Sequence, residues 1–270
     1  MNRMKTLYIL MISAMMITLL AMFANGVFEA PEECSVQQAA ADEYMWYYLP
    51  HESQQQPKPM EKAPYIKNYP VIYVGNAEEN KIYLTFDDCP ANENIPTILD
   101  TLKSHHAVAT FFMTEGYIRQ NPDVINRILS EGSLIGNHTA KHVGVTRLNF
   151  DQFKAQLQGV EDAFYETTGT QLPKFFRPPQ GLFSEQTLKF ADEMGYTTVF
   201  WSFRYSDWDV NHQPSKECAY KTIMNETHPG EIVLLHSQSK TNVSILDSIL
   251  SAWEEQGYSF GLISEISADR

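Results

Sequence analysis

Two adjacent aspartates after an apolar segment and two histidines four residues apart are the side chains whose types and spacing could do chemistry. The aspartates are Asp87 and Asp88 in TFDDCP, and the histidines are His138 and His142 in NHTAKH. One carboxylate can bind a metal ion while its neighbour acts as a base, and imidazoles are ligands that divalent zinc, cobalt or nickel accepts. Together the two motifs indicate a hydrolase site.

We expect strands and helices to position these residues, because short apolar segments alternate with segments of helical periodicity along the chain. The expected strands are 81–87, 107–113, 133–137, 174–177, 197–202, 231–236 and 258–264. Helical spacing between them includes the series Ile95, Ile98, Leu99 and Leu102. Strands separated by helices predict an α/β fold with a parallel sheet, either closed into a barrel or open and doubly wound.

The polar residues of interest follow the ends of several of these strands. They are Asp87 and Asp88, His138, Arg177, Asp207 and His236. Residues from so many strand ends can meet only if the strands surround one point, as at the C-terminal mouth of a β/α barrel. We therefore expect a distorted (β/α) barrel of about seven parallel strands.

Five motifs in this order resemble those of the polysaccharide deacetylases, carbohydrate esterase family 4, also called the NodB-homology domain. They are TFDD, HTAKH, RPPQG at 177–181, Asp207-Trp208 and LLH at 234–236, and the resemblance covers residues 81–264. The segments FRPPQGLFSE, FWSFRYSDW and HPGEIVLLHSQSKTN are similar to the branch that forms muramic δ-lactam in the spore cortex. Five ordered matches are more specific than any one of them.

The resemblance implies that Asp88, His138 and His142 hold a divalent metal, with zinc favoured and cobalt or manganese as alternatives. Such a metal lowers the pKa of bound water from about 15.7 to roughly 7 and polarises the amide carbonyl. The family's general base corresponds to Asp87, and its general acid, which protonates the leaving amine, corresponds to His236.

The other motif residues have supporting roles by resemblance. Arg177 would keep Asp87 ionised, because an adjacent cation lowers the pKa of an acid. Asp207 would tune the general acid, while Trp208 and Leu235 would form the walls of the pocket for the acetyl methyl group. The third motif would contribute substrate contacts through Pro179 and Gln180, with the backbone N–H of Gln180 near the oxyanion.

Two positions depart from the family pattern. Cys89 stands where most members have glycine, and a thiol there could crowd the mouth, respond to oxidation or join a metal shell. Gln180 stands where many members have tyrosine, but a backbone donor survives that change. We expect both substitutions to be tolerated.

Each motif also has a simpler structural explanation when taken alone. The pair His138 and His142 could be ordinary polar loop residues, and His236 could be a core histidine with satisfied hydrogen bonds. Trp208 could serve only core packing, and Arg177 before two prolines could belong to a turn. The ordered set favours the functional interpretation over these.

Composition limits the class of protein. With 270 residues, of which 43% are apolar, the chain can form one large catalytic domain with an appendage. The net charge of -13 excludes nucleic acid as a partner, because phosphate binding requires a basic surface. Three cysteines, Cys34, Cys89 and Cys218, are too few for a disulfide framework.

The N-terminal part predicts export. Residues 1–26 carry Arg3 and Lys5 before an uncharged apolar segment, which indicates either a signal peptide cleaved after Gly26 or an uncleaved membrane anchor. Residues 27–70 are rich in Gln and Pro and predict an extended linker, followed by the deacetylase domain at 71–270. The membrane would then be contacted only through the N-terminal segment.

The sequence therefore predicts an exported, metal-dependent N-deacetylase that acts on cell-wall glycan. The expected substrate is peptidoglycan N-acetylmuramic acid during formation of the spore cortex. Chitin oligomers or acetylated xylan are alternative substrates, and a wall-binding protein that has lost catalysis is the alternative outside enzymes. Nothing in the sequence indicates an oligomeric state.

Overall fold

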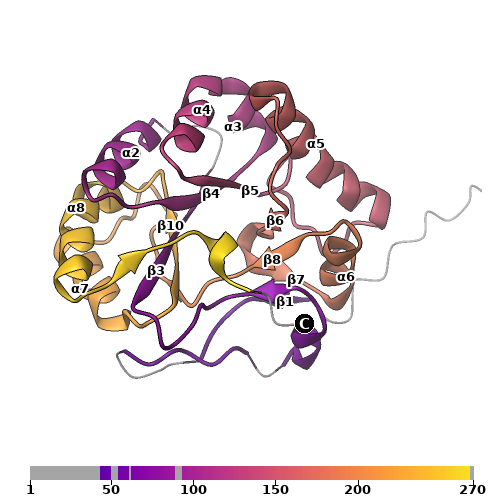
Figure 1. Ribbon diagram of the computed structural model, residues 1–270. Coiled ribbons are helices and arrows are strands. Elements are labelled where there is room, and N and C mark those ends of the chain that lie inside the picture. Colours follow the sequence, from indigo (N-terminus) through magenta and orange to yellow (C-terminus); the bar gives the residue numbers. More distant parts are fainter. Residues whose placement is uncertain (1–42, 50–53, 61, 89–92, 268–270) are drawn as a thin grey trace, which may run out of the picture. The chain divides into compact units, whose positions relative to one another are not determined.

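A curled parallel β-sheet with helices on its outer side forms the centre of the computed structural model (Figure 1). The structure describes residues 43–49, 54–60, 62–88 and 93–267. The strand order is β2 (Val71–Ile72), β8 (Thr197–Val199), β6 (Phe175–Phe176), β5 (Leu134–Asn137), β4 (Ala109–Met113), β3 (Lys81–Asp87), β10 (Glu231–His236) and β9 (Phe203–Arg204), with β11 (Ser259–Phe260) beside β3. All pairings in this sheet are parallel.

A single chain segment links the two ends of the strand order. It contributes β8 near one end and β9 at the other end. Between them, Phe200 N donates to Ile72 O over 2.8 Å and Ser202 N donates to Ile232 O over 3.0 Å. The sheet is therefore curled into a partial barrel, which confirms the predicted distorted barrel. Each of the seven expected strands is present, and β2 and β9 were not expected.

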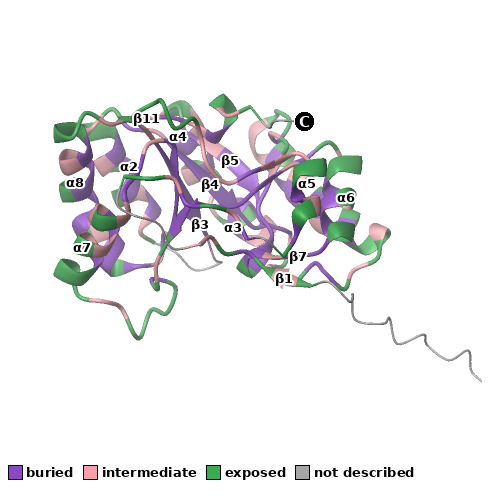
Figure 2. Cartoon of the chain, turned by 90° about the horizontal axis from the view of Figure 1, so that it is seen from below, coloured by how far each residue is buried: buried purple, intermediate pink, exposed green. Residues whose placement is uncertain are grey.

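The helices pack their apolar faces on the sheet. They are α2 (Ile95–Ser104), α3 (Glu115–Gln120), α4 (Pro122–Ser130), α5 (Phe150–Thr168), α6 (Glu185–Glu193), α7 (Lys216–Glu226) and α8 (Lys240–Glu255). Sequence signals fix several ends: Pro122 is the first residue of α4, and the Ser184 side chain accepts a hydrogen bond from Thr187 N at the start of α6. The strands are buried, while the outer sides of the helices are exposed (Figure 2).

The segment before the sheet is packed, in contrast to the predicted linker over residues 27–70. In β1 (Tyr44–Met45), the chain pairs antiparallel with β7 (Leu182–Phe183). Trp46 is fully buried, its Nε1 donates to Trp201 O over 2.8 Å, and its ring stacks on Phe200 at 4.4 Å. The described part of 43–70 therefore belongs to the domain, because this aromatic segment covers apolar side chains that would otherwise face water.

We expect Trp46→Ala to lower the free energy of unfolding by about 3–5 kcal/mol, the usual cost of removing a buried Trp side chain. Denaturant unfolding of the purified chain measures this. The neighbouring Tyr47, which is 38% exposed, provides the control, since Tyr47→Ala should change stability by only about 0.5 kcal/mol. Equal effects of the two substitutions would show that residue 46 is not part of the core.

Several predicted features lie outside the described residues. They are the signal or anchor segment 1–26, Cys34 and Cys89. In the part of the chain that the structure describes, none of the helices is both long enough and apolar enough to span a membrane. Cys218 is a free, exposed thiol.

Candidate active site

The predicted catalytic residues lie at the C-terminal edge of the parallel sheet. Asp87 ends β3 and lies opposite His236, which ends β10. The residues just before His138 and Arg177 pair in register between β5 and β6. Because neighbouring parallel strands end on the same side, these four side chains converge at the mouth of the partial barrel.

Arg177 is a fully buried cation held by several protein groups. Its Nη1 donates to Asp87 Oδ1 and to Thr85 Oγ1, each over 2.8 Å. Nε donates to Val199 O over 3.2 Å and Nη2 to Phe200 O over 3.1 Å. Its guanidinium carbon also lies 4.2 Å from the centre of the Phe112 ring. These contacts hold the guanidinium in one orientation. In this orientation it fixes the carboxylate of Asp87 at the end of β3.

Asp87 is 6% exposed and remains a carboxylate despite its burial. Burial alone would raise its pKa, but the charges of Arg177, His138 and His236 and the Arg177 hydrogen bond together hold the pKa of Asp87 below its usual value. Its Oδ2 lies 3.6 Å from His138 Nε2. The site thus holds an ionised carboxylate with one oxygen directed to the imidazoles.

The two histidines of the HTAKH motif lie together, with ring centres 4.9 Å apart. His138 Nδ1 is 2.8 Å from Arg177 O, which makes Nδ1 the protonated nitrogen and leaves Nε2 as the possible ligand atom. Burial lowers the pKa of His138 to about 4, and burial also lowers the pKa of His142. Both imidazoles are therefore neutral near pH 7, as a metal ligand must be.

Asp88 is fully buried, and its Oδ1 accepts a hydrogen bond of 2.8 Å from Ser237 Oγ. Ligating carboxylates receive orienting hydrogen bonds of this kind, so the donor chemistry of Asp88 and the two imidazoles fits a divalent metal. The structure does not assemble the trio, however. Among residues 43–49, 54–60, 62–88 and 93–267, no three His, Cys, Asp or Glu side chains are grouped closely enough to hold a metal ion.

His236 and Asp207 form the second charged pair of the site. His236 Nδ1 is 2.8 Å from Asp207 Oδ1, and His236 N donates to Asp207 Oδ2 over 2.7 Å. Asn242 Nδ2 donates to the same Oδ2 over 2.6 Å. Burial acts to lower the pKa of His236, but the hydrogen bond and charge of Asp207 outweigh it and raise the pKa above its usual value. This arrangement favours an imidazolium that can donate a proton.

Residues 74–199 match the family model described as polysaccharide deacetylase. Over 205 residues the chain is 40% identical to the peptidoglycan-N-acetylmuramic acid deacetylase PdaA of Bacillus subtilis strain 168, which covers 76% of this chain and 78% of that protein. The chain belongs to the polysaccharide deacetylase family. The family predicted from the five motifs is thereby confirmed.

Solved structures agree with this assignment. The structure of Bacillus subtilis PdaA, a family 4 carbohydrate esterase, superimposes with a TM-score of 0.79 at 37% identity and covers 83% of this chain and 96% of that chain. A family 4 pseudoenzyme from Bacillus anthracis has a TM-score of 0.67 at 30% identity and covers 73% of this chain and 68% of that chain.

A further relative was found by sequence. A peptidoglycan-N-acetylglucosamine deacetylase of Bacillus cereus is 32% identical over 200 residues, which are 73% of this chain and 71% of that protein.

In this deacetylase, Trp208 lies beside the predicted acid, but Leu235 does not. Trp208 is 46% exposed, and its ring centre is 6.5 Å from that of His236. Leu235 packs in the core that includes the helices α2 and α8, because successive side chains of a strand point to opposite faces. The expectation for Leu235 is therefore wrong. Leu234 is the residue of this motif that shares the face of β10 with His236.

The third motif forms a 3₁₀ turn, η2 (Pro179–Gly181). Pro179 is buried, and Gln180 is exposed with a φ of 60°, a left-handed conformation that few non-glycine residues adopt. At Gly181 a Cβ would lie 2.6 Å from the Trp201 ring, so glycine is required. The roles of Pro179 and Gln180 toward substrate stay predictions, as does any role of Cys89, which lies outside the described residues.

The sequence motifs did not reveal the residues that orient the predicted catalytic groups. They are Thr85 beside Arg177, Ser237 beside Asp88, and Asn242 beside Asp207. For Thr85 and Leu234 a signal existed, since each lies two residues before a site residue and must share its face of the strand. Ser237 directly follows His236, whereas Asn242 lies in α8 and reaches the site only through the tertiary fold.

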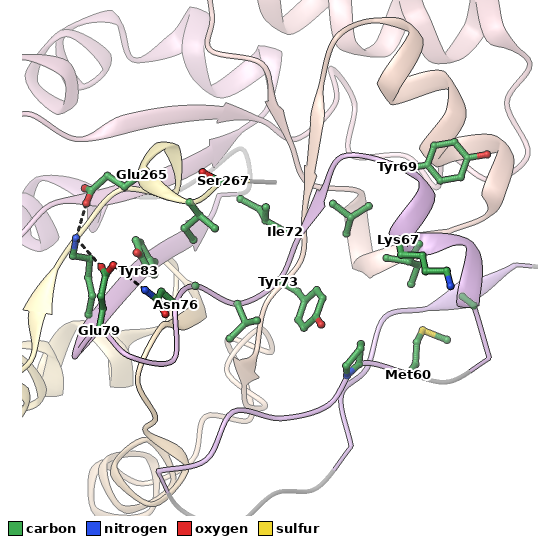
Figure 3. Close-up of a pocket in the computed structure, with 18 of the residues that line it drawn as sticks. Met60, Lys67, Tyr69, Ile72, Tyr73, Asn76, Glu79, Tyr83, Glu265 and Ser267 are labelled. Atoms are coloured by element: carbon green, nitrogen blue, oxygen red, sulfur yellow. Dashed lines mark hydrogen bonds and ion pairs between the residues drawn. The ribbon is translucent and has the colours of Figure 1, made fainter. Parts of the chain in front are cut away.

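A hollow of about 900 Å³ lies away from this site (Figure 3). Its lining includes Lys81 and Tyr83 from the start of β3, together with Tyr69, Tyr73 and Glu265. The length of β3 places it about 20 Å from the catalytic end of that strand. None of the predicted site residues is among its described lining, so we assign the chemistry to the mouth of the partial barrel.

Proposed function

We propose that this deacetylase hydrolyses the N-acetyl groups of peptidoglycan, with N-acetylmuramic acid as its preferred sugar. The supporting observation is a pair of oppositely tuned acid–base groups on adjacent strands. Arg177 keeps Asp87 ionised, and Asp207 favours the protonated form of His236. Groups whose pKa values are moved in opposite directions are typical of a general base and a general acid in one site.

Amide hydrolysis needs both groups. Asp87, with one oxygen held by Arg177 and the other directed to the imidazoles, takes a proton from the attacking water. His236, protonated and held through Nδ1 by Asp207, gives a proton to the leaving amine, which is otherwise a poor leaving group. Pairing in register between β3 and β10 places the two groups on neighbouring strand ends.

Asp88, His138 and His142 would hold a divalent metal in this mechanism. When bound, the metal would lower the pKa of water and polarise the acetamide carbonyl. Zinc suits two imidazoles and one carboxylate, and cobalt and manganese are alternatives. The protein's contribution is to keep both imidazoles neutral and to orient the carboxylate through Ser237.

We expect removal of bound metal by a chelator to lower acetate release at least about 10²-fold, because the water and the carbonyl lose their activating cation. Adding zinc, cobalt or manganese in turn should restore the rate and rank the three ions. Metal analysis of His142→Ala, with His212→Ala as an exposed control, gives a readout besides activity. Unchanged rates after complete removal would contradict metal dependence.

Mass spectrometry of wall fragments tests the substrate. Peptidoglycan is digested before and after treatment with the purified chain, and we expect muramic acid residues that lack acetyl groups together with released acetate. Similarity to PdaA favours N-acetylmuramic acid as the sugar, and the resemblance to the δ-lactam-forming branch favours a role in the spore cortex. A cell-wall substrate also implies an extracytoplasmic location. If acetate appears only from glucosamine residues, the proposed sugar is wrong.

The same assays distinguish two alternatives to this function, namely a different acetylated substrate and a wall-binding protein without catalysis. Similarity to a peptidoglycan-N-acetylglucosamine deacetylase favours a test on chitin oligomers and acetylated xylan beside peptidoglycan. Similarity to a family 4 pseudoenzyme favours a test of the wall-binding alternative. A wall-binding protein would retain peptidoglycan without releasing acetate and would need no stoichiometric metal.

A further inference from the structure

An exposed cation and an exposed aromatic ring lie side by side next to the proposed general acid. The Trp208 indole is 46% exposed, and its centre lies 6.5 Å from the His236 ring at an angle of 64°. The guanidinium carbon of Arg204 lies 5.6 Å from the same indole centre. Arg204 and the proposed acid His236 therefore both lie beside the Trp208 ring.

The fold holds Arg204 in this place. It belongs to β9, where it pairs with Leu234 of β10. Its backbone N–H donates to the Tyr48 hydroxyl over 3.3 Å. Its neighbour Phe203 is buried in the helix-side core, so alternation along the strand directs Arg204 to the face that carries Leu234 and His236.

The charge of Arg204 is not neutralised by a described carboxylate. The arginines that form ion pairs within the described residues are Arg119, Arg127 and Arg177. The chain as a whole carries a net charge of -13. A cation without such a partner, at the rim of a site in a strongly acidic protein, is suited to bind an anionic group of the substrate.

We propose that Arg204 binds the lactyl carboxylate of a muramic acid residue and so distinguishes muramic acid from glucosamine. This inference rests on the proposed function. Muramic acid carries its lactyl ether on the ring carbon next to the one that bears the acetamide, and glucosamine has a hydroxyl there. With the acetamide nitrogen at His236 and the sugar against Trp208, the carboxylate reaches the planar guanidinium, which can donate two parallel hydrogen bonds.

Binding measurements in an Asp87→Asn background test the proposal without turnover, with His236→Gln as a second background should the first not fold. The probes are a disaccharide that ends in N-acetylmuramic acid with a free lactyl carboxylate, and diacetylchitobiose, which lacks that group. Calorimetry gives the ratio of the two affinities. Arg204→Gln should lower the preference for the muramic probe on the order of tenfold to a hundredfold, the usual loss for a hydrogen bond to a charged group.

Two matched variants define the outcome. Lys221→Gln removes one exposed positive charge in α7 and should keep the preference, while Arg204→Lys should retain part of it, since lysine offers a point charge without the planar fork. A parent protein that does not distinguish the probes, or an Arg204→Gln variant that matches Lys221→Gln, overturns the proposal. Acetate release by the wild-type chain is scored separately, so that the proposed function and the role of Arg204 can fail independently.

Discussion

Replacing Asp87 by asparagine is expected to lower kcat for acetate release about 10²- to 10⁴-fold, the contribution of a general base. Asparagine keeps the size of the side chain and can still accept a hydrogen bond from Arg177, but it cannot take a proton from water. Initial rates with peptide-stripped peptidoglycan measure the effect. An unchanged rate would exclude Asp87 as the base.

The same substitution also affects stability, because it leaves the buried Arg177 without a counter-charge. Loss of one partner of a buried ion pair costs about 3–5 kcal/mol, so thermal unfolding should be measured beside activity. Since the pKa of Asp87 is lowered, its stabilising effect is present above the unfolded-state pKa and is lost as the pH falls through the folded-state value. Asp123→Asn, at an exposed position in the first turn of α4, is the matched control.

Sequence periodicity was sufficient to predict the sheet and the position of the acid–base groups. The apolar segments that became β3, β5, β6 and β10 end where the polar chemistry begins, and parallel strands bring such ends together. The five ordered motifs identified the family. The sequence alone therefore allows Asp87, His138, Arg177 and His236 to be assigned to one site.

Long-range pairing could not be predicted in the same way. Tyr44 pairs with Phe183, which lies far from it in the sequence. A two-residue strand has no periodicity that would reveal such a pairing. Composition alone therefore predicted a linker over residues 27–70, whereas Trp46 in this segment is buried in a cluster of aromatic side chains. The error at Leu235 is of another kind, since alternation along β10 already places Leu235 on the face opposite to that of His236.

The proposed base and the proposed acid differ in how the fold supports them. Asp87 depends on one fully buried cation, Arg177, which also donates hydrogen bonds to Thr85 Oγ1 and to the backbone carbonyls of Val199 and Phe200. His236 depends on Asp207, which lies after β9 and receives a further hydrogen bond from Asn242 in α8. The proposed base is thus held by residues of the sheet and the proposed acid by a loop and a helix, so we expect substitutions beside the acid to leave the buried arginine undisturbed.

Asp207→Asn is accordingly expected to reduce kcat on the order of 10²-fold near pH 8 and to move the alkaline limb of its pH profile to lower pH. Burial, the largest influence on His236, lowers its pKa, and without the Asp207 charge only the weaker influence of the Asp87 charge opposes burial. The imidazolium is then lost at a lower pH than in the wild type. An alkaline limb that does not move would exclude Asp207 as the residue that tunes the acid.

Stability supplies an independent check on the same pair. Because the folded-state pKa of His236 is raised, the stabilisation by Asp207 is complete below the unfolded-state value of about 6.5 and is lost as the pH rises through the folded-state value. The difference in unfolding free energy between the wild type and Asp207→Asn should therefore be largest in mildly acidic buffer and shrink toward alkaline pH. A purely structural hydrogen bond would give a difference that is independent of pH, which distinguishes tuning of the acid from simple packing.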